Sequence, residues 1–114
     1  MSIIYVPVHK NSDGAHLETS LPSVLEGRIT PEEWEEITRF VSKMMNRRER
    51  LAFVKALSIV FLGPYVKKYL HYKIDREIER YLDKKNIALS DAGIFFHHPK
   101  ERVYSGMDVS VSFF

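Results

Sequence analysis

A run of twelve residues in the middle of the chain, residues 51–62, is almost entirely apolar. Its sequence is Leu-Ala-Phe-Val-Lys-Ala-Leu-Ser-Ile-Val-Phe-Leu, in which only the lysine and the serine are polar. A helix built from it has no polar face, so the domain, a partner or lipid must cover it. Twelve residues fall well short of the roughly 20 that span a bilayer. The segment therefore predicts either a core helix or a helix that contacts a partner or a membrane surface.

The residues before this segment have the pattern of an amphipathic helix. Thr30 is a suitable N-cap, Pro31 suits the first helical position, and apolar residues then recur at helical spacing. We expect one helix over about 31–46. Asn46 is a good capping residue, so we expect it to start a second helix that contains residues 51–62.

Gly63-Pro64 interrupts the helical pattern after the apolar segment. Proline lacks the amide proton that the preceding turn needs, and its ring crowds the carbonyl four residues back. Apolar residues at a spacing of four resume beyond it and continue to about Asn86. We therefore expect a kink or a new helix at Gly63-Pro64, and two to three helices in all.

Both ends of the chain have strand patterns. Residues 3–8 are rich in β-branched and aromatic side chains, and a turn signal at 11–14 predicts an N-terminal β-hairpin. Pro7 cannot donate to a neighbouring strand, so we expect the first strand to lie at an edge or to end near Pro7. Near the C-terminus, residues 94–96 predict a short strand, and residues 107–113 alternate between apolar and polar side chains.

Length and composition indicate one α+β domain over residues 1–114, with antiparallel strands packed on the helices. At 45% hydrophobic residues, a chain of 114 residues can build one core. It has no cysteine, which excludes disulfides, thiolate metal sites and thiol nucleophiles. The N-terminus lacks the basic start and the apolar core of a signal peptide, so we expect a protein of the cytosolic side.

The sequence has no pattern typical of catalysis, of a metal site or of a cofactor site. His97 and His98 are adjacent in an extended segment, so their side chains should point to opposite faces and not converge on a metal ion. No glycine-rich phosphate loop and no nucleophile elbow is present. The 17 basic and 15 acidic residues are too nearly balanced for a dedicated nucleic-acid binder. We expect a protein that is not an enzyme and that binds no nucleic acid.

Two motifs carry a resemblance to a known family, together with the basic amphipathic stretch between them from His71-Tyr72 to Tyr81-Leu82. The first is residues 21–29, Leu-Pro-Ser-Val-Leu-Glu-Gly-Arg-Ile, followed by the helix start Trp-Glu-Glu-Ile at 34–37, and the second is residues 93–102, Gly-Ile-Phe-Phe-His-His-Pro-Lys-Glu-Arg. The chain resembles the golgin subfamily A member seven family, which are accessory subunits of DHHC-type protein S-acyltransferases and include the yeast Ras palmitoyltransferase partner. It departs from the family pattern at His98, where the family has aspartate, and at Val103, where it has glycine. It also lacks the cysteines that metazoan members carry in the central apolar helix.

The resemblance implies a non-catalytic accessory subunit that binds and stabilises an integral-membrane DHHC-type acyltransferase in protein palmitoylation. The location it implies is the cytosolic face of endoplasmic reticulum or Golgi membranes, as a peripheral protein. The candidate partner-binding residues are Phe53, Val54, Leu57, Val60 and Phe61 in the apolar segment, and Glu26, Arg28, Glu101 and Arg102 in the two motifs. The alternative for the first five is burial in the core, and for the charged residues it is an ion pair that fixes a loop.

Other binding functions are open at this point. The chain could be an unrelated soluble adaptor, such as a homodimer that buries the apolar helix against its own copy. The basic residues that flank the apolar segment, Arg47, Arg48 and Arg50 before it and Lys67 and Lys68 after it, could meet an anionic membrane surface. Acidic residues are interleaved with many of the basic ones further along the chain, which is also typical of an ordinary solvated helix face.

Overall fold

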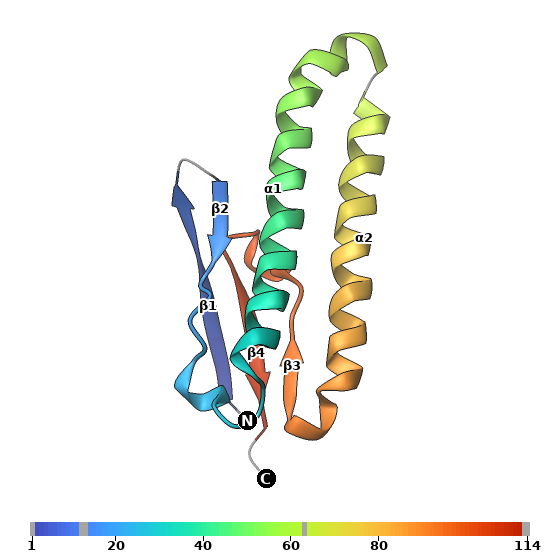
Figure 1. Cartoon of the computed structure of the whole chain (residues 1–114). Helices are drawn as coiled ribbons and strands as arrows, with labels where there is room; N and C mark the ends of the chain where they lie inside the picture. The colour runs from blue at the N-terminus through green and yellow to red at the C-terminus, as the bar shows by residue number, and fades with distance from the viewer. Residues whose placement is uncertain (1, 12–13, 63, 113–114) are drawn as a thin grey trace.

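The computed structural model describes residues 2–11, 14–62 and 64–112, with the side chains of residues 50–68 outside the described part. Its main elements are β1 (Ser2–Asn11), β2 (Gly14–Leu17), α1 (Pro31–Leu62), α2 (Pro64–Ala88), β3 (Ile94–Phe96) and β4 (Gly106–Val111). Short 3-10 turns lie at Ser23–Leu25, Ser90–Ala92 and Pro99–Arg102. Figure 1 shows a four-stranded sheet and, against one face of it, two long helices that run antiparallel to each other. The predicted α+β fold is confirmed.

The sheet has the strand order β2-β1-β4-β3, and all neighbouring strands are antiparallel. The prediction that the first strand lies at an edge or ends near Pro7 is wrong, because β1 sits between β2 and β4 and continues to Asn11. Pro7 is accommodated because it pairs with Gly106 at the end of the β4 ladder, and the pairing with β2 starts at the next residue, Val8. Its missing amide proton therefore interrupts neither ladder.

The helical region consists of one long helical hairpin. α1 is continuous from Pro31 to Leu62, so the predicted helix start at Asn46 is wrong. Residues 46–50 contain neither glycine nor proline, and nothing in them prevents helix propagation. The predicted break is confirmed, since α1 ends at Leu62 and α2 begins at Pro64.

The hydrophobic core lies between the sheet and the adjoining half of the hairpin. Trp34 is fully buried and its ring centroid lies 6.1 Å from that of Phe96 in β3. The predicted alternation in β4 is confirmed, because its apolar side chains face the helices and are fully buried. The main core residues are Val6, Leu17, Leu25, Trp34, Ile37, Val41, Ile74, Ile78, Leu82, Ile94, Phe96, Met107, Val109 and Val111.

The hairpin extends beyond the sheet. Figure 1 shows that the C-terminal half of α1 and the N-terminal half of α2 continue beyond the sheet. Residues 51–62 form part of this extension. The predicted residues Phe53, Val54, Leu57, Val60 and Phe61 lie on it, and their side chains are outside the described part of the chain. Among the described residues, no helix combines the length and the apolar character that crossing a membrane requires.

Candidate partner-binding surface

The sheet face opposite the helices carries exposed apolar side chains. Ile3 is 61% exposed, Tyr5 46% and Phe95 50%. The register places Ile3 and Phe95 on either side of Ser110, so these two side chains flank the same position of β4. We call this patch the open face; it consists of Ile3, Tyr5, Phe95, His97, Glu101, Arg102 and Asp108.

Arg102 lies along this face. Its Nε donates to Asp108 Oδ2 at 2.8 Å, and its guanidinium group lies 5.4 Å from the centre of the Tyr5 ring. The hydrogen bond to Asp108, followed by the charge of that carboxylate, raises the pKa of Arg102. The Tyr5 hydroxyl in turn donates to the carbonyl of Ser105 at 2.9 Å. These contacts fix the position of the Arg102 side chain, a predicted partner-binding residue, on an exposed surface.

Glu101, the second predicted residue of this motif, pairs with His97. Its Oε2 lies 3.4 Å from His97 Nδ1, and His97 Nε2 lies 2.6 Å from the hydroxyl of Ser110. The Phe95 ring meets the same imidazole edge-on at 5.0 Å between centroids. Arg102 therefore forms an ion pair with Asp108 and Glu101 contacts the His97 ring, while both residues remain exposed on the open face.

The loop after this motif has an unusual backbone. Val103 has φ 52° and Tyr104 has φ 61°, in the left-handed region that residues other than glycine rarely adopt. Val103 is β-branched and 86% exposed, so its own side chain does not hold this conformation. A network of contacts around the neighbouring Tyr104 side chain supplies the restraint.

Asp75 of α2 is the centre of that network. It accepts from the Tyr104 hydroxyl and, at 3.1 Å, from Nε of Arg48 in α1. The Arg48 guanidinium group lies 4.2 Å from the centre of the Tyr104 ring. Burial, the hydrogen bond to Asp75 and its charge raise the pKa of Tyr104. The network joins both helices to the loop at the level where the hairpin leaves the sheet.

The first motif has a structural role in part. Arg28 Nη1 donates to the carbonyl of Ala92 at 3.1 Å and to that of Ser112 at 2.5 Å. It therefore connects the loop before α1 to the residues that flank β3 and β4. Glu26 lies exposed in the same loop. The structure does not bring these two residues together with Glu101 and Arg102 into one cluster.

The two histidines of the second motif point to opposite sides, as predicted. His97 faces the open face, whereas His98 Nε2 lies 2.9 Å from the carbonyl of Asp75 in α2. In the described part of the chain, no three histidine, aspartate or glutamate side chains are grouped so as to hold a metal ion.

Two asparagines close the edges of the sheet, a role that the sequence analysis assigned to neither of them. Asn46 accepts from the amide of Ala15 at 2.8 Å and donates to its carbonyl at 2.9 Å. Asn86 does the same for Phe96, at 2.7 and 3.1 Å. Ala15 lies in the edge strand β2 and Phe96 in the edge strand β3, so each clamp satisfies backbone groups that another strand would otherwise pair. One signal in the sequence could have indicated this role. Asparagine is a poor helix former, so its presence inside a helical pattern suggests that its side chain binds backbone groups elsewhere.

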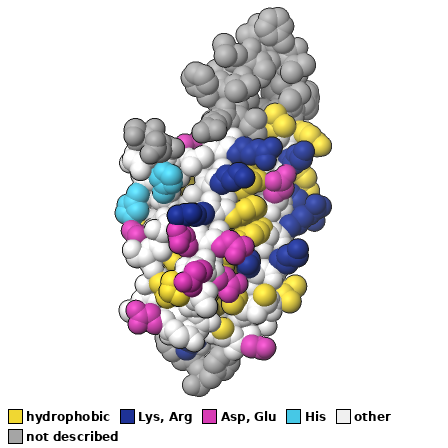
Figure 2. Space-filling model, in the orientation of Figure 1, with side chains coloured by type: hydrophobic (Ala, Val, Ile, Leu, Met, Phe, Trp, Pro, Cys, Tyr) yellow, Lys and Arg dark blue, Asp and Glu magenta, His cyan; other side chains and the backbone are white. Residues whose placement is uncertain are grey.

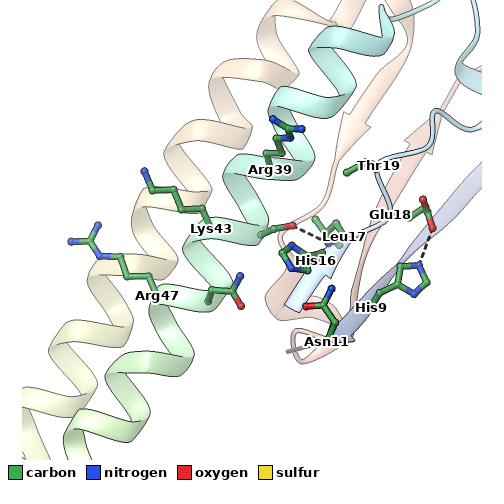
Figure 3. Close-up of a pocket in the computed structure, with 11 residues that line it drawn as sticks. His9, Asn11, His16, Leu17, Glu18, Thr19, Arg39, Lys43 and Arg47 are labelled. Carbon is green, nitrogen blue, oxygen red and sulfur yellow. Dashed lines mark hydrogen bonds and ion pairs between the residues drawn. The ribbon is translucent and has the colours of Figure 1, made fainter. Parts of the chain in front are cut away.

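A cleft of about 850 Å³ lies between β2 and α1. Ser42, which accepts from the Leu17 amide at 2.9 Å, and Asn46 connect its two sides. Figure 3 shows Arg39, Lys43 and Arg47 on successive turns of α1, with His9, His16 and Glu18 on the strand side. On the helical side of the molecule in Figure 2, histidines lie at one margin and basic side chains gather nearer the hairpin extension, with acidic ones nearer the base.

Comparison with known proteins identifies no family for this chain. No protein-family model matches it, and a search of curated proteins finds no significant match. The resemblance to the golgin subfamily A member seven family therefore stays a prediction that rests on the two motifs and the helical stretch between them.

Proposed function

We propose that this protein is a non-catalytic accessory subunit that binds and stabilises an integral-membrane DHHC-type protein S-acyltransferase. The observation that carries the proposal is the position of the apolar segment 51–62 in the part of the hairpin beyond the sheet (Figure 1). An apolar helix that the sheet of its own domain does not reach needs another surface to cover it. A membrane enzyme offers such a surface, and α2 can cover only one side of the segment.

The second motif gives the proposal independent support. Glu101 and Arg102 lie on an exposed surface beside Tyr5 and Phe95, where a partner can contact them. Val103 occupies the position where the resembling family has glycine, and its left-handed backbone is the conformation that glycine favours. The local backbone is thus of the kind that the family motif encodes.

The proposed division of labour follows from the composition of the chain. Thioester chemistry needs a thiol, and this chain has no cysteine, so the catalytic cysteine and the zinc sites would lie in the partner. The packed base of the domain would serve as a rigid support for the hairpin. The protein would then act at the cytosolic face of endoplasmic reticulum or Golgi membranes as a peripheral subunit.

The test is affinity purification of the tagged protein from membranes in mild detergent, with identification of what binds. We expect a DHHC-type acyltransferase, and we expect it to be lost when Phe53→Gln, Leu57→Gln or Phe61→Gln replaces a side chain in the interface. Ile87→Gln is the matched control, since Ile87 is apolar, 78% exposed and at the opposite end of α2. If the parent protein recovers no acyltransferase, the proposal is wrong. If folded variants at all three positions retain it, the assignment of the interface to this segment is wrong.

A further inference from the structure

We propose that the cleft between β2 and α1 binds a small polyanion that carries two or more phosphate groups. The cleft volume, about 850 Å³, is within the range of small-molecule sites. Three of its lining residues, Arg39, Lys43 and Arg47, are cationic, and one, Glu18, is acidic. This inference goes beyond the accessory-subunit proposal and does not depend on it.

The charges of the cleft are not equally available to a ligand. Arg39 forms an ion pair with Glu35, and Glu18 pairs with His9 Nε2 at 2.9 Å. Hydrogen bonds from Ser20 and the contact with His9 lower the pKa of Glu18, so it stays ionised at neutral pH. Lys43 and Arg47, by contrast, form no ion pair or hydrogen bond with any residue in the described part of the chain. Lys43 and Arg47 are therefore available to an anionic ligand, whereas the carboxylate of Glu18 already contacts His9.

The spacing of these two cations suits a ligand with more than one anionic group. Lys43 and Arg47 are four residues apart, so they lie about 6 Å apart along the axis of α1. Figure 3 shows that both project from the same side of α1, with their ends directed away from the strands that form the other wall of the cleft. Because both are exposed and unpaired, they can turn over the cleft without breaking an ion pair.

The base of the cleft is held in place by contacts between α1 and β2. Ser42 and Asn46 are committed to the backbone of β2, so the base of the cleft is fixed before any ligand binds. On the strand side, His16 makes no hydrogen bond to another described residue and is free to donate to an anion. Preorganised walls of this kind lower the cost of ordering on binding.

The described part of the lining has donors that suit phosphate oxygens and no surface on which a nucleobase could stack. Arginine presents a planar fork of donors that matches phosphate oxygens, and lysine is a common phosphate ligand. None of the described lining residues is Phe, Tyr or Trp, so nothing there stacks with a nucleobase in a single-stranded nucleic acid. The phosphates can belong to a free molecule or to a lipid headgroup, and the chemistry of recognition is the same.

The test is titration of the full chain with inorganic pyrophosphate, followed by calorimetry and by amide chemical shifts. We expect saturable binding, with the largest shifts at His16, Lys43 and Arg47. The double variant Lys43→Gln/Arg47→Gln should weaken binding at least about tenfold, because each charged hydrogen bond lost is worth about that factor. The matched control is Arg80→Gln/Lys84→Gln, which removes two exposed cations with the same spacing from α2. It should leave the affinity within about twofold, because those side chains do not line the cleft.

Four outcomes overturn the proposal: no binding by the parent, an unchanged affinity in the first double variant, an equal loss in both, or binding of an acidic peptide but not of pyrophosphate. Phosphatidylcholine vesicles with and without phosphatidylinositol bisphosphate identify the source of the ligand. Binding to the bisphosphate vesicles that Lys43→Gln/Arg47→Gln abolishes assigns the cleft to a lipid headgroup. Binding of soluble pyrophosphate alone assigns it to a free ligand, and both results support a phosphate site.

Discussion

The two faces of the sheet, built by the same strands, differ completely in what they contact. On the helix side, Met107, Val109 and Val111 of β4 are fully buried. On the other side, Ile3 and Tyr5 of β1 are about half exposed, and β4 contributes Asp108 and Ser110. The difference shows that strand alternation alone produces a core on one side and leaves an apolar surface with fixed charges on the other.

The edges of the sheet form the border between these faces. At each edge a helix asparagine binds the outward backbone groups of one strand residue, so these positions are closed to the addition of another strand. A partner that reaches the sheet is therefore expected to use side chains of the open face, and not the Ala15 or Phe96 backbone.

The largest expected effect on stability comes from the core between the helices and the sheet. Trp34→Ala should lower the free energy of unfolding by about 3–5 kcal/mol, because it removes the largest fully buried side chain of the core. Urea unfolding followed by circular dichroism measures it. A loss below about 1 kcal/mol would contradict the packing described here.

A direct comparison of the two faces uses neighbouring residues of β3. Phe96→Thr should destabilise the fold by several kcal/mol, on the order of 3, whereas Phe95→Thr should change stability by no more than about 0.5 kcal/mol. Threonine keeps a side chain suited to a strand at both positions. Thermal melts of the two variants measure these changes. Equal losses of stability in Phe95→Thr and Phe96→Thr would show that the open face is also buried. Under the proposed function, Phe95→Thr should also weaken recovery of the acyltransferase.

The edge clamps should have intermediate effects. Asn46→Ala and Asn86→Ala should each cost about 1–3 kcal/mol, since each leaves buried backbone groups of a strand without a partner. Hydrogen exchange separates the two: the Ala15 amide should exchange faster only in the first variant, and the Phe96 amide only in the second. Lys84→Ala, an exposed change one turn or less from Asn86, is the control and should affect neither amide. Unchanged exchange at both amides would show that the clamps do not form in solution.

The smallest change in stability is expected at Val103, in the loop beside the open face. Here the substitution should stabilise the protein, whereas the preceding ones destabilise it. Val103→Gly should stabilise the protein by about 0.5–1 kcal/mol, because glycine adopts the left-handed backbone without the strain that a β-branched residue has there. Val24→Gly is the control: Val24 is also an exposed valine, but it is not among the residues with positive φ, so the same change should destabilise. Differential scanning calorimetry measures both. A destabilised Val103→Gly protein would show that the loop is not held in this conformation.

Much of the fold could be predicted because its signals are local. The Thr30 hydroxyl accepts from the Glu33 amide at 3.1 Å, as the capping pattern predicts, and Pro64 starts α2. The candidate site was only partly predictable. Glu101 and Arg102 were selected from a motif, but their placement beside Tyr5 joins residues about 100 positions apart in the chain. The cleft and the uncommitted Lys43 and Arg47 were not predicted as a site, because its two walls come from separate elements.

Local signals in the sequence were enough to predict most of the helix and strand positions, the inward-facing residues of β4 and the break of the hairpin before Pro64, because propensity, periodicity and capping act over a few neighbouring residues. Three features follow from tertiary contacts instead: β1 is central, Asn46 closes an edge of the sheet and does not start a helix, and Val103 has a left-handed backbone. Each of these depends on partners that are distant in sequence. Asn46 reaches Ala15, 31 positions away, and Asp75 holds Tyr104, 29 positions away. Such pairings are set by the packing of the helices on the sheet, which no local pattern encodes.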